Sequence, residues 1–145
     1  MADDRLWYLK DHESASGHRE VRNHYDDASD TLQAAFDVHW DYLRVRSRDQ
    51  WVRPKAHKLR PEEKGGFRDF FEFRFREEGT QQRPLGYFAD GSKHFILLIW
   101  ATEKGSKFVP TEAVKICNKR RDSIIKLTAK PAHWSDEEND EDDKT

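Results

Sequence analysis

An apolar run in the second half of the chain is the feature that most restricts how it can fold. From His94 to Ala101 the sequence reads His-Phe-Ile-Leu-Leu-Ile-Trp-Ala. A strand with one face in solvent alternates apolar and polar side chains, whereas a strand covered on both faces does not. The run therefore predicts a central strand with a covering layer on each face.

Two further segments predict strands beside it. Residues 67–76 have the two-residue period of a half-buried strand, which gives each face its own residue type. The phenylalanines share one face, Phe71, Phe73 and Phe75, and the charged residues share the other, Glu72, Arg74 and Arg76. Residues 81–88 predict a returning strand with Arg83, Leu85 and Tyr87 on one face, and with an edge position or a bulge at Pro84, which cannot donate a hydrogen bond. The turn signal Asp90-Gly91 then leads into the apolar run.

Helical periodicity appears on both sides of these strands. Residues 20–27 predict a short helix, and a second helix begins at Asp30, with apolar side chains at three- and four-residue spacings. These positions are Leu32, Ala35, Phe36, His39, Trp40 and Leu43. His39 is interpreted as a core histidine, because no second histidine at metal-ligand spacing accompanies it on this helix. A third helix begins at Pro110 with a buried stripe and ends before Pro131.

These elements predict an α+β fold. An N-terminal helical hairpin packs on a small antiparallel sheet, made of a three-strand meander plus a short N-terminal strand at residues 6–9, and a C-terminal helix closes it. At 145 residues the chain has the size of one domain, which we expect over residues 1–134. Residues 135–145 are too acidic and too poor in apolar side chains to fold, and predict a disordered tail.

Cysteine content and hydropathy indicate the compartment. Cys117 is the single cysteine, so no internal disulfide is expected, and its place on the apolar stripe of the third helix predicts a buried thiol. The N-terminal region has no apolar run long enough to predict a signal peptide or a membrane span. We therefore expect a cytoplasmic protein that does not associate with a membrane.

The charges are distributed unevenly, although the net charge is only −2. Residues 53–134 contain 18 basic and 10 acidic side chains, whereas the segments before and after them are acidic. A basic block of this size is suited to a polyanion, because lysine and arginine that neutralise phosphates release condensed counterions. A solvated surface that happens to be basic is the alternative on charge alone.

Short motifs inside this block resemble those of the RelE/ParE toxin superfamily. Residues 71–75, Phe-Glu-Phe-Arg-Phe, resemble the family's aromatic-Glu-hydrophobic-Arg strand, and residues 83–88, Arg-Pro-Leu-Gly-Tyr-Phe, resemble its next strand. Residues 103–110 resemble its lysine-rich loop ending in proline, and residues 111–121 resemble the helix that follows. The likeness is greatest to the phage-derived HigB-like group. It covers residues 19–127 and is specific from 67 to 121.

The resemblance implies the toxin of a type II toxin–antitoxin module, an endoribonuclease that cuts messenger RNA at the ribosome without a metal or cofactor. Its partners would be a cognate antitoxin protein, messenger RNA and the ribosome. The residues at matching motif positions are implied to be catalytic: Arg74, Arg83, Lys104 and Lys107. Their neighbours are implied to bind RNA: Lys58, Arg60, Arg76 and Tyr87. Attack of a ribose 2′-hydroxyl on a phosphate needs a proton acceptor, cations for the developing charge and a proton donor.

Other interpretations remain open at this point. A ParE-like protein would inhibit DNA gyrase instead, and a non-catalytic phage-related module would use the basic sheet only to bind nucleic acid or protein. Arg74 and Arg76 could form the solvent face of a strand, with Arg74 paired to Glu72. Arg83 could pair with Glu77 or Glu78 near the hairpin, and His57 is expected to be a surface histidine.

Overall fold

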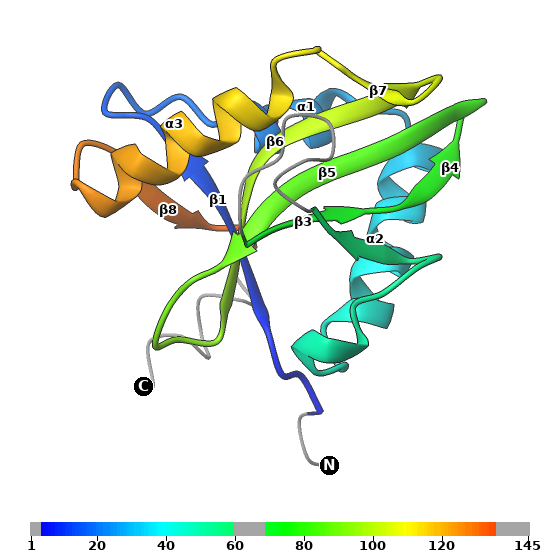
Figure 1. The fold of residues 1–145 in the computed structure, drawn as a ribbon, viewed down its shortest axis with the longest axis horizontal. Coiled ribbons are helices and arrows are strands. Elements are labelled where there is room, and N and C mark those ends of the chain that lie inside the picture. The colour runs from blue at the N-terminus through cyan, green and yellow to red at the C-terminus, as the bar shows by residue number, and fades with distance from the viewer. Residues whose placement is uncertain (1–3, 60–68, 136–145) are drawn as a thin grey trace.

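Strand β6 (His94–Lys104) lies inside a mixed sheet of eight strands (Figure 1). The structure is a computed structural model, and it describes residues 4–59 and 69–135. The main path of the sheet runs β2-β3-β5-β6-β1-β8, with β4 paired to β5 and β7 paired to β6. Residues Phe95 to Ala101 of β6 are all buried. The prediction of a central strand covered on both faces is confirmed.

The other elements have these bounds. The strands are β1 (Tyr8–Glu13), β2 (Ala56–Lys58), β3 (Phe70–Phe73), β4 (Phe75–Glu77), β5 (Thr80–Phe88), β7 (Lys107–Val109) and β8 (Lys130–His133). The helices are α1 (Glu20–Asp27), α2 (Asp30–Leu43) and α3 (Ala113–Ile125), with a 3₁₀ turn η1 (Arg48–Gln50). No helix in the described residues has both the length and the apolar character needed to cross a bilayer.

The sheet separates the hydrophobic core into two layers, and helices cover each face. Helices α1 and α2 contribute Val21, Phe36 and Trp40 to one layer. Helix α3 lies on the opposite face and contributes Val114 and Cys117 to the other layer. Burial raises the pKa of the Cys117 thiol, as expected for a structural cysteine. Both core layers meet on β6, because its side chains enter them from the two faces.

The phase predicted for residues 71–76 is also found. Phe71 and Phe73 enter the core layer under α2, and Phe75 packs against that layer. The rings of Phe73 and Trp40 stack with centroids 6.1 Å apart. Glu72 lies on the opposite face but is fully buried there. The alternation therefore predicted the direction of these side chains correctly, while the burial of Glu72 depends on its partners.

The predicted fold class is wrong in the size and type of the sheet. The sheet is mixed, because β1 runs parallel to β6 with Tyr8 opposite His94. It also contains three strands of three or four residues that have no apolar period of their own, namely β2, β7 and β8, and the strand predicted at 67–76 forms two strands, β3 and β4. Strands this short form because neighbouring strands offer them unpaired backbone N–H and C=O groups, which is a tertiary property.

The helical part of the predicted fold differs as well. Helices form over 20–27 and 30–43 as expected, but they do not pack as a separate hairpin on a small sheet. Helix α1 contacts β1 and β6, whereas α2 contacts β4. Because the eight-stranded sheet is wide, each helix finds its own area of apolar surface.

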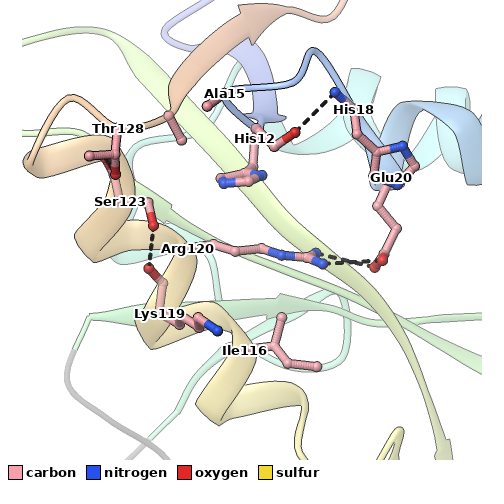
Figure 2. Close-up of a pocket in the computed structure, with 11 residues that line it drawn as sticks. His12, Ala15, His18, Glu20, Ile116, Lys119, Arg120, Ser123 and Thr128 are labelled. Carbon is pink, nitrogen blue, oxygen red and sulfur yellow. Dashed lines mark hydrogen bonds and ion pairs between the residues drawn. The ribbon is translucent and has the colours of Figure 1, made fainter.

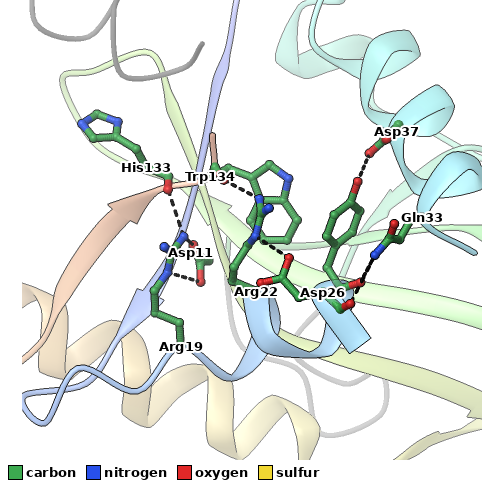
Figure 3. A network of polar contacts seen from close by, with 9 residues as sticks. Asp11, Arg19, Arg22, Asp26, Gln33, Asp37, His133 and Trp134 are labelled. Atoms are coloured by element: carbon green, nitrogen blue, oxygen red, sulfur yellow. Dashed lines mark hydrogen bonds and ion pairs between the residues drawn. The ribbon is translucent and has the colours of Figure 1, made fainter. Parts of the chain in front are cut away.

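A buried ion pair joins β1, the start of α1 and the edge strand β8 (Figure 3). Asp11 of β1 is fully buried and accepts hydrogen bonds from the guanidinium of Arg19, at 3.2 Å from Nε. Arg19 also donates to the backbone oxygen of His133 at 2.9 Å, and Arg22 donates to that of Trp134. Burial raises the pKa of Asp11, although the Arg19 hydrogen bond and charge oppose the rise. The pair therefore anchors the last strand while keeping a buried carboxylate compensated.

Replacing Arg19 tests this anchor. Arg19→Met leaves the Asp11 carboxylate buried without its main partner, and should destabilise the protein by about 3–5 kcal/mol at pH 7. Loss of Arg19 raises the pKa of Asp11 further, so the folded variant takes up a proton as the pH falls and the loss should be smaller at pH 5. Urea unfolding at both pH values measures it. The control is the double variant Arg19→Met with Asp11→Asn, whose loss of unfolding free energy should depend little on pH.

A second prediction concerns the close approach of β5 and β6. The register between these strands shifts at Leu85/Gly86, and a Cβ added at Gly86 would lie 2.3 Å from the Ile96 backbone oxygen. Gly86→Ala should therefore cost about 2–3 kcal/mol by overpacking. Gly79→Ala is the matched control: Gly79 has open space around it and only a positive φ of 69°, so its cost should be about 1 kcal/mol. Equal losses in urea unfolding would contradict the close-approach explanation.

Candidate functional site

Four arginine side chains line an open cavity of about 350 Å³ beside β4 and β5. The residues that line it are Arg53, Pro54, Arg74, Phe75, Arg76, Gln81 and Arg83. No carboxylate belongs to this lining among residues 4–59 and 69–135. We call this site the arginine cavity. It brings together three of the residues that the sequence analysis selected, Arg74, Arg76 and Arg83.

Strand phase and register explain why these arginines meet. Arg74 follows β3 directly and Arg76 lies within β4, so both keep the phase of the charged face. The β4–β5 register places Arg76 opposite Gln81 and Phe75 opposite Gln82. Arg83, one residue further along β5, shares the phase of Leu85, which belongs to the core layer on the α3 face. The local sequence pattern thus determines on which face of the sheet each arginine lies, and the β4–β5 register brings the arginines of the two strands together.

Arg53 reaches the cavity from the connector between α2 and β2. The backbone oxygen of Lys55 accepts a hydrogen bond from the Arg74 N–H at 2.9 Å, which holds this connector beside β3. Arg53 is not among the residues that the sequence predicted for the site. Its only sequence signal is its position before Pro54 in a basic connector, and that signal does not reveal where the connector packs.

Two carboxylates lie behind the arginines in a buried ionic network. The Glu72 carboxylate accepts a hydrogen bond from Arg74 Nη1 at 2.7 Å, and its other oxygen lies 3.9 Å from Arg83 Nε without a hydrogen bond. Arg83 Nε donates to Glu103 Oε1 at 2.9 Å. The predicted alternative that Arg74 pairs with Glu72 is therefore observed. Arg83 pairs with Glu103, so the predicted alternative partners on the β4–β5 turn are wrong.

Arg83 is the most constrained of the four arginines. Its side chain is only 4% exposed. Hydrogen bonds to Glu103, Gln81 and the backbone oxygens of Phe75 and Gln82 occupy four of its five N–H groups. Arg83 is therefore a fixed positive charge at the back of the cavity.

The outer part of the arginine cavity has a different character. Arg53 and Arg76 are exposed, and no carboxylate lines the cavity in the described part of the chain. Guanidinium groups stay charged, can bind phosphate oxygens in a bidentate manner, and do not accept protons at physiological pH. The described lining can thus bind phosphate and stabilise negative charge, but proton transfer requires another group.

His39 supports the cavity from the core. It is buried, and its Nε2 donates to the backbone oxygen of Lys55 at 2.8 Å, the same oxygen that Arg74 N–H contacts. Burial lowers the pKa of His39 to about 4. The neutral imidazole with Nε2–H is the form that fits this hydrogen bond, because a carbonyl oxygen can only accept. His39 is thus a core histidine that holds the connector in place.

The two predicted catalytic lysines lie on a hairpin next to the arginine cavity. Lys104 and Lys107 face each other across the turn between β6 and β7, and both are exposed. Neither lines the cavity. The hairpin adjoins it nevertheless, because Glu103 directly precedes Lys104 and contacts Arg83.

Two of the remaining predicted RNA-binding residues, Lys58 and Tyr87, do not line the arginine cavity. Lys58 lies on edge strand β2, with its Nζ 3.8 Å from Asp69. Tyr87 is buried in the core layer of α3, where burial raises its pKa and Arg121 lies over its ring. Arg60 lies outside the described residues. Tyr87 shares the alternating pattern of Arg83, but the packing of Tyr87 in the core layer of α3 separates their surroundings.

The pH dependence of stability tests the role of His39. Between pH 6.5 and 4 the unfolded chain binds a proton at this position and the folded chain does not, so stability falls as the pH falls. The shift from 6.5 to about 4 corresponds to a loss of about 3 kcal/mol. His39→Gln should flatten the profile in urea unfolding between pH 7 and 4.5. His57→Gln should retain the slope because His39 remains, and parallel profiles for wild type and His39→Gln would contradict the assignment.

Comparison with known proteins adds no relative to this picture. No protein-family model, no curated protein and no solved structure matches the chain. The likeness to RelE/ParE toxins therefore stays a prediction based on the short motifs at residues 67–121. The function has to be argued from the arginine cavity and its surroundings, because a fold alone does not determine function.

Proposed function

We propose that this protein is the toxin of a type II toxin–antitoxin module and binds messenger RNA through the arginine cavity to cleave it without a metal. The observation that carries the proposal is the convergence of two predicted catalytic residues, Arg74 and Arg83, with the predicted RNA-binding Arg76 in one open cavity. Arg53 lines the same cavity.

The electrostatics of the site support binding to an RNA backbone. Residues 53–134 carry an excess of basic side chains, and the cavity concentrates four of them without a lining carboxylate among the described residues. Phosphates release condensed counterions when such groups neutralise them, which makes the affinity strongly dependent on salt. The exposed Arg53 and Arg76 are placed to make the first contacts.

The buried network supports a role in charge stabilisation. Cleavage by a ribose 2′-hydroxyl builds negative charge on the phosphorane, and preorganised cations stabilise it without reorienting. Arg74 and Arg83 are held in position by Glu72 and Glu103 before any ligand enters. In this proposal Lys104 and Lys107 on the adjacent hairpin take part in proton transfer, which the arginines cannot perform.

A second candidate function is a non-catalytic module that binds nucleic acid or protein through the same surface. The hydrogen bonding of Arg83 favours it: four of its five N–H groups are already occupied within the protein. In that case Arg83 has a structural role, and Arg53 and Arg76 alone form the binding surface.

Induction in bacteria distinguishes these functions. Expression of the wild-type chain should arrest growth, and primer extension on cellular messages should show new 5′ ends. Arg53→Ala with Arg76→Ala should relieve the arrest, because it removes the exposed phosphate contacts without touching the buried network. Lys115→Ala with Lys126→Ala removes two exposed cations outside the cavity, one on α3 and one at its C-cap, and should leave the arrest unchanged.

The other outcomes decide between the alternatives. Growth arrest without message cleavage would eliminate the nuclease and favour inhibition of gyrase. Absence of arrest, together with salt-dependent RNA binding that Arg53→Ala with Arg76→Ala weakens at least tenfold, would favour the binding module. Equal effects of the two double variants would show that the arginine cavity is not the site.

A further inference from the structure

A second cavity, of about 340 Å³, lies between β1, the loop that follows it and α3 (Figure 2). It is distinct from the arginine cavity, with which it shares no lining residue. Its polar lining contains two imidazoles, two cations, one carboxylate and three hydroxyl groups. These are His12, His18, Lys119, Arg120, Glu20, Ser14, Ser123 and Thr128.

Arg120 forms the floor of this second cavity and is fixed by two elements. Its guanidinium makes two hydrogen bonds of 3.1 Å to the Glu20 carboxylate and one of 2.8 Å to the backbone oxygen of Leu98. Leu98 lies at the register shift of β6, where Leu97 pairs with Gly86 and Ile99 pairs with Leu85. The bulge leaves the Leu98 carbonyl out of the β5 ladder, so Arg120 can reach it.

His12 points into the cavity above the Arg120 side chain (Figure 2). Burial is the main cause that lowers the pKa of His12, and the charge of Arg120 adds to it. The charge of Glu20 opposes the shift, whereas His18 adds to it, so both groups lie within electrostatic range of His12. Burial and the charge of Arg120 therefore disfavour a protonated His12, and an anion placed between these groups would oppose that preference.

We propose that this cavity binds the terminal phosphate of a small phosphomonoester. Lys119, the two imidazoles and the N–H groups of Arg120 that Glu20 and Leu98 leave unused supply donors on several sides of one space. The Glu20 carboxylate pairs with Arg120, which offsets in part its repulsion of an anion. A phosphate dianion is the common ligand that combines two charges with three acceptor oxygens.

A metal ion fits this cavity less well than an anion. Across residues 4–59 and 69–135, no three histidine, cysteine or acidic side chains come together as metal ligands. Lys119 and Arg120 would also repel a cation that entered the cavity.

The remainder of the lining defines the rest of the ligand. The cavity volume of about 340 Å³ exceeds what a bare phosphate fills, and it lies in the range typical of small-molecule sites. Ala15, Ile116 and Ala129 give it an apolar part. These features indicate a phosphate attached to a compact organic group, such as the sugar of a nucleotide. This inference does not rest on the proposed function in RNA cleavage.

Calorimetric titration of the full chain with adenosine 5′-monophosphate tests the site. The nucleotide should bind, adenosine should show no detectable binding, and a dinucleotide with only an internal phosphodiester should bind at least tenfold more weakly. Inorganic phosphate separates the two sources of this chemistry. If inorganic phosphate binds more weakly than the nucleotide, the ligand is an ester. If the two bind equally, the ligand is free phosphate.

Three single variants give effects of opposite sign that damage to the fold would not produce. Lys119→Gln removes an exposed cation of the lining and should weaken binding at least tenfold. Glu20→Gln frees Arg120 and removes the negative charge, so it should strengthen binding several-fold. Lys126→Gln, on the same side of the sheet but outside the lining, should leave the affinity unchanged.

A spectroscopic measurement provides an independent check. In nuclear magnetic resonance titrations the pKa of His12 should rise by about one unit when the nucleotide saturates the protein, because the phosphate dianion stabilises the protonated imidazole electrostatically. Equal binding of adenosine and its 5′-monophosphate, equal losses for Lys119→Gln and Lys126→Gln, or no binding at millimolar nucleotide would overturn the proposal. None of these variants alters the arginine cavity, so the proposed function is tested separately.

Discussion

The burial of β6 on both faces is the constraint on which the rest of the structure depends. Its apolar run cannot be satisfied by one layer, so α1 and α2 cover one face and α3 covers the other. Its backbone must also be paired on both sides, and β5 and β1 provide that pairing. The bulge at Leu98 is a local departure from this order, and it leaves a carbonyl group that Arg120 uses.

Both cavities form where this arrangement leaves polar groups beside a rigid sheet. At the arginine cavity, Glu72 and Glu103 compensate two of the four positive charges and fix their direction. Burying such charges costs several kcal/mol per ion unless each has partners. Cations held in this way are oriented before a ligand arrives, which favours charge stabilisation over adaptable binding. At the second cavity, Glu20 has the same effect on Arg120 from a different helix.

Much of the fold could be predicted from local sequence patterns. The parts that could not be predicted have clear physical causes. The helices at 20–27 and 30–43 and the central position of β6 were predictable, because each depends on a periodicity within one segment. The sheet was predicted too small and wholly antiparallel. Strands such as β2 and β8 have no pattern of their own, and the parallel pairing of β1 with β6 joins residues more than eighty positions apart. Such pairings depend on which sheet edges remain open after the core has formed.

The candidate site divides in the same way. The alternation in residues 71–76 determined that Arg74 and Arg76 share a face, since successive side chains of a strand point to opposite sides. Only the register of β4 with β5 decided that Arg83 joins them, and only the packing of a connector held by His39 brought Arg53 to the same cavity. Tyr87 was separated from them by the cover of α3, and Lys58 by its place on the edge strand β2. The sequence by itself thus determined which side chains point together along one strand. The tertiary structure decided which strands lie side by side, because that choice depends on the burial and pairing of the whole sheet.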